Sequence, residues 1–331
     1  MDVQLSAEAL EFGAQARRAF ELAGGDALLQ QAEAHPHLRR ELVEPILESL
    51  GAWDLSPRRD AHELEAAAAL CRSAGYWALP YPVAERLARS DRLDPDGHAP
   101  DGLVVISPRN PHGPLAGLGF HWAAVTPDGT PGNVTVTQTD SPPRQSAFST
   151  PLEWRPVVQT AGTAADGCDG LLDLALGLVL PCWTLLGMLD RALDLTRAHV
   201  LVREQFGRPL AEFQGVQFQL TEAEVERRGV DMLARYALWG IASGRPEAVE
   251  DALALRLAAL EAAEIVFRVA HQLHGALGFC DESPLSWLSR YSLPLRRLPL
   301  GAAATEELLT RRVGRRGLTG LFSGPENAKG A

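Results

Sequence analysis

The sequence has few cysteines and less positive than negative charge. None of its four cysteines belongs to a C-x-x-C pair, which argues against a disulfide framework or a cysteine metal cage and favours buried free thiols in a reducing compartment. The 31 Lys and Arg against 42 Asp and Glu give a net charge of -11, which repels a phosphate backbone. We therefore expect no nucleic acid partner and no metal site. The cysteines are Cys71, Cys168, Cys182 and Cys280.

The sequence also lacks a recognisable leader and an unbroken membrane-spanning run. Its N-terminus has no basic start followed by an apolar core, so we expect no signal peptide. The most apolar stretch, residues 171–188, is interrupted by Asp173, Gly177 and Pro181, and a buried helix explains it better than a membrane span. These absences predict a cytoplasmic protein without a membrane partner.

What the sequence does contain is a helical first part followed by a change of character. A length of 331 residues with 46% hydrophobic composition suits about two domains with a sizeable core. Residues 1–90 predict an N-terminal helical domain. Residues 91–165, rich in Pro, Gly, Asp and Thr, predict a small β domain with a turn at 127–132. We expect helices at 5–24, 38–50, 60–75 and 83–89, and strands near 103–106, 121–126, 134–138 and 154–159.

Residues 166–323 predict a C-terminal helical domain of the four-helix-bundle type, and residues 324–331 a flexible tail. The first helix should cover 169–204, with Asp169 as its cap and a bend at Pro181. The second should cover 211–242, and a third should start at 245. Shorter helices should follow Pro284 and span 302–313. The expected buried stripes are Leu185, Leu189, Ala192, Thr196 and Val200 on the first, Val216, Leu220, Ala223, Val230, Leu233 and Ala237 on the second, and Leu253, Leu257, Leu260, Ala263, Phe267 and Ala270 on the third.

A short motif joins the first two of these helices. Arg203 is followed by Phe206 and Gly207, and then by Phe213 and Gln214. This spacing resembles the Arg-x-x-Phe-Gly…Phe-Gln signature of the acyl-CoA dehydrogenase family. The resemblance implies that Arg203, Phe206, Phe213 and Gln214 contact an FAD bound to a neighbouring subunit. The chemistry is suitable, because a guanidinium pairs with a pyrophosphate in bidentate fashion and Gly207 allows a sharp turn.

A second motif follows at the end of the third helix. The run Gln272-Leu273-His274-Gly275-Ala276 resembles the Gln-x-x-Gly-Gly turn of the same family, with alanine in place of the second glycine. The resemblance implies that Gln272, Leu273, Gly275 and Ala276 contact the same flavin. The two motifs occur in the order that the family has.

Each motif also has an ordinary structural interpretation. Arg203 suits the C-terminus of any helix, and Gly275 suits any helix C-cap. His271 and His274 lie three apart and could ligate a metal, but no cysteine or carboxylate completes a set, so structural histidines are expected. The last helix ends in basic residues, which predict either a solvated face or a docking patch for a coenzyme A phosphate: Arg311, Arg312, Arg315 and Arg316.

The position of a catalytic base is the main departure from the family. Acyl-CoA dehydrogenation removes the α-proton of a CoA thioester with a carboxylate while the β-hydrogen leaves as hydride to the flavin. In most members that glutamate precedes a Gly-Thr pair, and its counterpart here is Leu300, before Gly301. In other members the base lies on the helix before the first motif, near Gly177 here. Neither residue accepts a proton, so we predict no catalytic residue on this chain.

The combination resembles the base-lacking subunits of heteromeric α2β2 acyl-CoA dehydrogenases from actinobacterial steroid and side-chain degradation. It implies a mainly α fold with a small β domain, an FAD shared with a catalytic acyl-CoA dehydrogenase subunit, a bulky acyl-CoA substrate, and an electron-transfer flavoprotein or similar acceptor. The β region lacks the family's Thr-Glu-Pro-x-x-Gly-Ser and Trp-x-Thr-Asn segments, which agrees with an incomplete flavin site. The alternatives are a flavin monooxygenase or oxidase of the same fold, and a structural assembly subunit without flavin contact.

Overall fold

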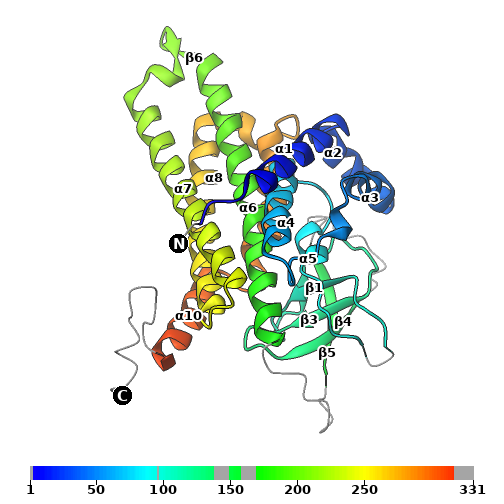
Figure 1. Ribbon diagram of the computed structural model, residues 1–331. Coiled ribbons are helices and arrows are strands. Elements are labelled where there is room, and N and C mark those ends of the chain that lie inside the picture. The colour runs from blue at the N-terminus through cyan, green and yellow to red at the C-terminus, as the bar shows by residue number, and fades with distance from the viewer. Residues whose placement is uncertain (1–2, 95–96, 138–148, 158–168, 317–331) are drawn as a thin grey trace.

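One long central helix organises the structure. The computed structural model describes residues 3–94, 97–137, 149–157 and 169–316. Helix α6 (Asp169–Val202) runs through the middle, with the N-terminal helices and the sheet on one side and the remaining C-terminal helices on the other (Figure 1). The fold is therefore mainly helical with a small β region, as the sequence predicted. The predicted tail at 324–331 and Cys168 lie outside the described residues.

The N-terminal region is helical, with one helix more than the sequence predicted. Ser6 caps the first helix, because its hydroxyl accepts a hydrogen bond from the amide of Ala9 at 3.3 Å. We expected the chain after Gly25 to leave helical structure, but Gly25 instead precedes a second helix with φ of 52°. The helices are α1 (Ala7–Leu22), α2 (Asp26–Ala34), α3 (Arg39–Ser49), α4 (Ala61–Tyr76) and α5 (Val83–Leu87).

A five-stranded sheet packs beneath the start of α6. Its order is β1-β3-β4-β5-β2, with β1 parallel to β3 and the other pairs antiparallel. The turn between β3 and β4 includes Gly129 with φ of 89°, which fits the predicted turn. The short second strand was not predicted. The strands are β1 (Gly102–Val105), β2 (His112–Gly113), β3 (Trp122–Val125), β4 (Pro131–Val136) and β5 (Thr150–Pro156).

The C-terminal helices confirm most of the expected buried faces. The whole predicted stripe of α6 is buried. The stripe of α7 (Gln214–Ala242) was wrong at Leu233, which is 38% exposed, whereas Ala234 is buried. The expectation of buried thiols was wrong for Cys280, which is exposed. The other helices are α8 (Ala248–His274), α9 (Pro284–Arg297) and α10 (Ala302–Arg316), and Leu257 on α8 is only partly buried.

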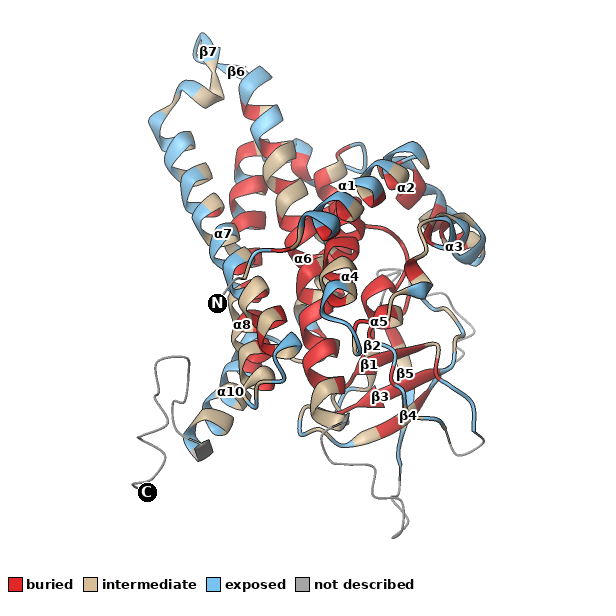
Figure 2. Cartoon of the chain, in the orientation of Figure 1, coloured by how far each residue is buried: buried red, intermediate tan, exposed pale blue. Residues whose placement is uncertain are grey.

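Helix α6 is long and apolar enough to cross a bilayer, judged by length and composition alone. However, 72% of its most apolar window is buried inside the fold. Its leucines pack against α4, α8 and the sheet, as Figure 2 shows by the continuous buried face of α6. Internal packing therefore accounts for its hydrophobicity.

Helices α4 and α6 cross with their backbones in contact. A Cβ added to Gly187 would lie 1.9 Å from the carbonyl oxygen of Arg72, and one added to Gly75 would lie 1.8 Å from that of Thr184. Real side chains cannot approach a backbone atom so closely. The two glycines therefore set the distance between the N-terminal region and the central helix.

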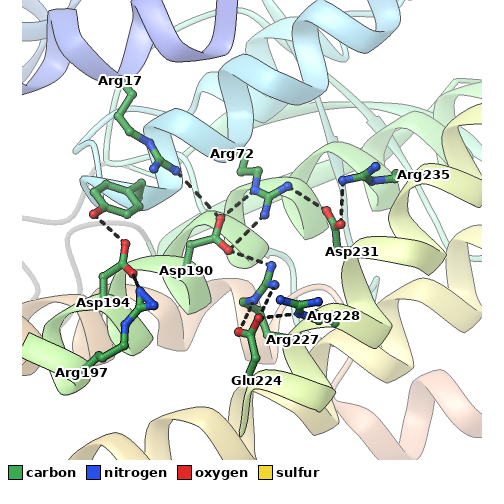
Figure 3. Close-up of polar contacts among 11 residues, drawn as sticks. Arg17, Arg72, Asp190, Asp194, Arg197, Glu224, Arg227, Arg228, Asp231 and Arg235 are labelled. Carbon is green, nitrogen blue, oxygen red and sulfur yellow. Dashed lines mark hydrogen bonds and ion pairs between the residues drawn. The ribbon is translucent and has the colours of Figure 1, made fainter. Parts of the chain in front are cut away.

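A network of ion pairs surrounds this crossing (Figure 3). Arg72 of α4 holds Asp190 of α6 through two hydrogen bonds, of 2.7 and 3.1 Å, and Asp231 of α7 through one of 2.8 Å. Arg227 of α7 donates to Asp190 at 3.2 Å, and Arg17 of α1 approaches it at 4.0 Å. Because bidentate pairs fix orientation as well as distance, the network sets how four helices meet.

A carboxyl group is buried near the same junction. Glu85 of α5 is 6% exposed, and its Oε1 has no hydrogen-bond partner in the part of the chain that the structure describes. It borders a small cavity of about 30 Å³, which has room for a water molecule or two. Burial raises the pKa of Glu85 to about 7, because desolvation disfavours the charged form.

The helix crossing makes a testable prediction. We expect Gly187→Ala to lower the free energy of unfolding by about 3 kcal/mol or more, because the new methyl group meets a backbone carbonyl that cannot move without separating the helices. Gly314→Ala is the matched control, since nothing lies within 4 Å of its added Cβ in α10. It should raise stability by up to about 1 kcal/mol. Equal urea midpoints for the two variants would contradict the packing.

The buried carboxyl predicts a pH dependence. The pKa of Glu85 rises on folding from 4.5 to about 7, so its contribution to stability is full below pH 4.5 and is lost between pH 4.5 and 7. We expect Glu85→Gln to be more stable than wild type by roughly 3 kcal/mol at pH 8, and the difference to shrink toward pH 5. Urea unfolding at both pH values measures this. The control Glu8→Gln, at an exposed glutamate, should show no such dependence.

Candidate functional site

The first motif forms a β-hairpin that extends beyond the ends of α6 and α7. Strands β6 (Glu204–Gln205) and β7 (Arg208–Pro209) pair antiparallel, and the amide of Leu210 donates to the carbonyl of Arg203 at 2.8 Å. The two turn residues, Phe206 and Gly207, have φ of 53° and 80°. Positive φ at both positions is the tightest hairpin geometry. The predicted sharp turn at Gly207 is therefore present.

Phe206 is held in a strained and exposed position. A left-handed backbone costs a non-glycine residue roughly 1–2 kcal/mol, and its ring is 91% exposed. The ring touches only the edge of Phe213, at 6.2 Å between centroids, while the guanidinium of Arg208 lies 4.1 Å from the centre of the Phe213 ring. Strain of this kind is concentrated at functional sites. The tip of the hairpin, residues 203–208, is exposed, and Figure 2 shows it at the far end of α6 and α7.

The tip also presents hydrogen-bond donors that have no acceptor among the described residues. The side chains of Arg203 and Gln214 are exposed and form no hydrogen bond or ion pair with any described residue. Gln214 opens α7, whose first turn has no side-chain cap from Phe213. An uncapped helix start attracts anions through its free N–H groups and its dipole. The tip is therefore suited to an anionic ligand that comes from outside this chain.

The second motif ends α8, close to the tip. Helix α8 stops at His274, and Gly275 follows with φ of 60° and its amide bonded to the carbonyl of His271. The side chain of Gln272 is exposed, as is Ala276. Leu273 is only 9% exposed and packs into the core, so only its backbone can meet a ligand. Gly275 is therefore a helix C-cap, and the turn that it forms is exposed.

An open cleft of about 500 Å³ lies beside the second motif. Gln272 and Gly275 line it together with His271, Phe279 and Arg296. Sequence reasoning did not select the last two, because they come from later segments and carry no motif. The cleft combines an aromatic surface with a guanidinium, which suits a flat ring attached to an anionic group.

A pair of stacked histidines joins the two motifs. The rings of His199 on α6 and His274 on α8 lie 4.5 Å apart and nearly parallel. His199 is one helical turn before Arg203, whose amide bonds to the carbonyl of His199 at 2.9 Å. His274 is fixed by a contact of 2.8 Å between Nδ1 and the carbonyl of Ala270. The structure therefore places the two predicted motifs next to one another, which spacing alone could not establish.

Burial lowers the pKa of all three histidines near the motifs. The effect on His199 is increased by repulsion from His274 and Arg203, and that on His271 by repulsion from His274 and Arg296. The rings are thus neutral at pH 7, which permits close stacking. His271 also stacks on Phe279 at 4.4 Å. Over the described ranges, no group of three or more histidine, cysteine or carboxylate side chains could hold a metal ion.

At the expected base position, the backbone is held in place by a buried arginine. Leu300 is half-buried, and its carbonyl and that of Leu298 each accept a hydrogen bond of 2.6 Å from the guanidinium of Arg256. Arg256 is buried, and desolvation lowers its pKa. It also binds the carbonyl of Leu295 near the end of α9, where a cation is favoured. This segment holds its shape through an arginine and carries no proton acceptor at Leu300.

The alternative base position has no room for a side chain. A Cβ on Gly177 would lie 2.6 Å from Cγ2 of Val105 on β1, because α6 packs directly on the sheet there. Sequence reasoning also missed the buried carboxyl of Glu85, whose cavity of about 30 Å³ is far below the volume of a typical ligand site.

The basic end of α10 is partly neutralised. Arg312 pairs with Glu250 at 3.0 Å, and Arg311 with Glu307 at 3.3 Å. The side chains of Arg315 and Arg316 lie outside what the structure describes. Paired arginines agree with the solvated-face interpretation of this segment.

Comparison with known proteins places these motifs in a family. Residues 174–318 match the profile described as acyl-CoA dehydrogenase, C-terminal domain. The chain is 32% identical to the acyl-CoA dehydrogenase FadE28 of Mycobacterium tuberculosis over 162 residues, which are 47% of this chain and 48% of FadE28. It is 37% identical to the 3-sulfinopropanoyl-CoA desulfinase of Paraburkholderia xenovorans over 107 residues, 32% of this chain and 26% of that enzyme. The chain thus spans about half or less of the length of these relatives.

Solved structures share the fold over nearly the whole chain. A chain of the ChsE4-ChsE5 complex from Mycobacterium tuberculosis superposes with a TM-score of 0.72 and 17% identity, covering 97% of this chain and 100% of that one. A chain of the Tcur3481-Tcur3483 steroid ACAD variant gives a TM-score of 0.70 and 19% identity, covering 95% and 99%. At this identity the likeness concerns the fold. The profile match and the curated relatives show that the C-terminal part of the chain, residues 174–318, is similar to the C-terminal domain of acyl-CoA dehydrogenases, and the solved structures share the fold of the whole.

Proposed function

We propose that this chain is the subunit of an FAD-dependent acyl-CoA dehydrogenase that completes the flavin site of a partner subunit and leaves proton abstraction to that partner. The single observation that carries the proposal is the tip: Arg203 and Gln214 project from the protein, without partners among the described residues. These two side chains are therefore free to contact a ligand held by another subunit.

The residues present fit a flavin dinucleotide that reaches across an interface. Arg203 and the uncapped start of α7 suit its pyrophosphate, and the cleft with Gln272 and Phe279 suits a ring system next to it. The bound flavin would accept the hydride in dehydrogenation. The role of this chain is to hold and orient, because Leu300 and Gly177 stand where a base is expected.

The surface of α7 supports a partner of the same kind. Phe218, Val225 and Met232 recur at seven-residue steps on one face and are each more than half exposed. Gly229 lies between them with open space above it, which permits another helix to approach closely. Exposed apolar stripes of this size mark interfaces. Figure 2 shows this outer face of α7, which leads directly up to the tip.

The comparisons favour a heteromeric assembly. The two structures described above are named as complexes of two different chains, and one of them as a steroid ACAD. By analogy we propose an α2β2 heterotetramer in the cytoplasm that acts on a bulky acyl-CoA, possessing fewer flavins than subunits and passing electrons to an electron-transfer flavoprotein or similar acceptor.

The tip predicts the flavin content of the complex. We expect Arg203→Gln, co-expressed with the catalytic subunit, to weaken flavin retention by roughly 10- to 100-fold, because a charge-assisted pair to the pyrophosphate is lost. Arg203→Lys should restore part of it. The absorbance ratio at 450 and 280 nm after gel filtration measures the flavin.

Arg197→Gln is the matched control, because Arg197 is exposed on α6 and pairs with Asp194. If the Arg203→Gln complex keeps its full flavin content and activity, a purely structural subunit is the correct reading.

The α7 stripe predicts how the partner binds. We expect Val225→Glu to weaken association with the catalytic subunit at least about tenfold, since an unpaired carboxylate would be buried in the contact. Leu10→Glu places the same charge at another exposed apolar residue, on α1, and should leave association intact. Mass photometry across a dilution series distinguishes the two, and equal dissociation constants would argue against α7 as the interface.

A further inference from the structure

A second cleft lies at the opposite end of α6 from the flavin motifs. It encloses about 550 Å³ between the loop before α4, the first turns of α6 and the turn joining α7 to α8. This volume is within the range of small-molecule sites. Its walls are mainly apolar and come from the four helices α4, α6, α7 and α8: Leu64, Leu171, Leu172, Ala175, Ile241 and Val249.

The cleft is too far away to belong to the flavin site. Leu172 lines it near the start of α6, and Arg203 follows the end of the same helix. A helix rises about 1.5 Å per residue, so the 31 residues between them correspond to roughly 46 Å. Figure 1 shows the two ends of α6 at opposite sides of the molecule. A ligand here would be a different molecule from the shared flavin.

Positive charge gathers at the mouth of the cleft. Arg58, Arg59 and Arg245 line it against a single carboxylate, Asp60, in a chain whose net charge is -11. Asp60 is occupied, because it accepts hydrogen bonds from two amides at the start of α4. Arg58 is also unavailable to a ligand, because it forms a buried ion pair with Asp173. The charge available to a ligand is therefore that of the two other arginines.

Arg59 is held loosely, whereas Arg245 is mostly buried and keeps one donor unused. Arg59 is 74% exposed and pairs at 3.3 Å with Asp91, which is itself exposed. Such surface pairs are worth at most about 1 kcal/mol. Arg245 pairs with Glu247 at 3.1 Å, and its buried Nε has no hydrogen-bond partner among the described residues. A carboxylate in the mouth could accept from both.

The start of α8 borders the cleft as well. Ala248 and Val249 of its first turn line the cleft. The helix dipole favours negative groups at this end, and Glu250 and Asp251 of the same turn already supply them, so a ligand anion is left to the two arginines. The apolar walls and the arginines thus converge on one kind of molecule.

We propose that this cleft binds a small amphipathic anion, with an apolar body against the leucines and a carboxylate between Arg59 and Arg245. The site is independent of the flavin tip and of the partner-binding face of α7. It gives the chain a ligand of its own, whatever the role of Arg203.

Titration calorimetry of the full-length chain tests this with octanoate as the probe. Octanoate should bind saturably at one site, octan-1-ol more weakly, and acetate undetectably. Arg245→Gln should weaken octanoate binding about tenfold and leave octan-1-ol unchanged. Ala242→Trp, at an exposed position of the lining, should abolish binding of both by filling the mouth.

The controls place the same changes elsewhere on the chain. Arg311→Gln and Ala303→Trp, both at exposed positions of α10, should bind octanoate like wild type, and thermal unfolding confirms that each variant is folded. The proposal is overturned if octanoate does not saturate, if folded Ala242→Trp binds it as wild type does, or if Arg245→Gln weakens octan-1-ol equally.

Discussion

The backbone contact between α4 and α6 is the constraint on which the rest of the structure depends. Gly75 and Gly187 allow the two helices to meet without side chains between them, and the ion pairs of Arg72 and Asp190 fix their orientation (Figure 3). Once α6 is held at this point, the positions of its two ends are determined. One end rests on the sheet and borders the 550 Å³ cleft, and the other carries the hairpin.

The ligand-accessible groups and the buried carboxyl lie in different parts of the chain. The hairpin has cations, an exposed aromatic ring and an uncapped helix start. The interior near Glu85 has a carboxyl but a cavity of only about 30 Å³. This division follows from where the side chains point and does not require any change in the fold.

Much of the fold could be predicted from sequence, because periodicity records burial directly. The stripe on α6 was correct throughout, since that helix is covered on most sides by its own chain. Leu233 was placed wrongly because α7 has a face that the chain does not cover, and apolar spacing cannot say which molecule covers it. Helix α2 was missed because Gly24 and Gly25 predict a stop, whereas here they form a tight turn into a new helix. The stacking of His199 on His274 and the burial of Glu85 depend on distant segments, so no local pattern could show them.

The hairpin turn at Phe206 and Gly207 is held within the hairpin itself, by the pairing of β6 with β7 and by the hydrogen bond from the amide of Leu210 to the carbonyl of Arg203. A shape that is encoded so locally exists before any encounter with another molecule. Association then loses little conformational entropy at this loop, and its rate is governed by diffusion and orientation instead of by slow ordering of the loop. The backbone strain at Phe206 is a free-energy cost of folding, so association does not add it again.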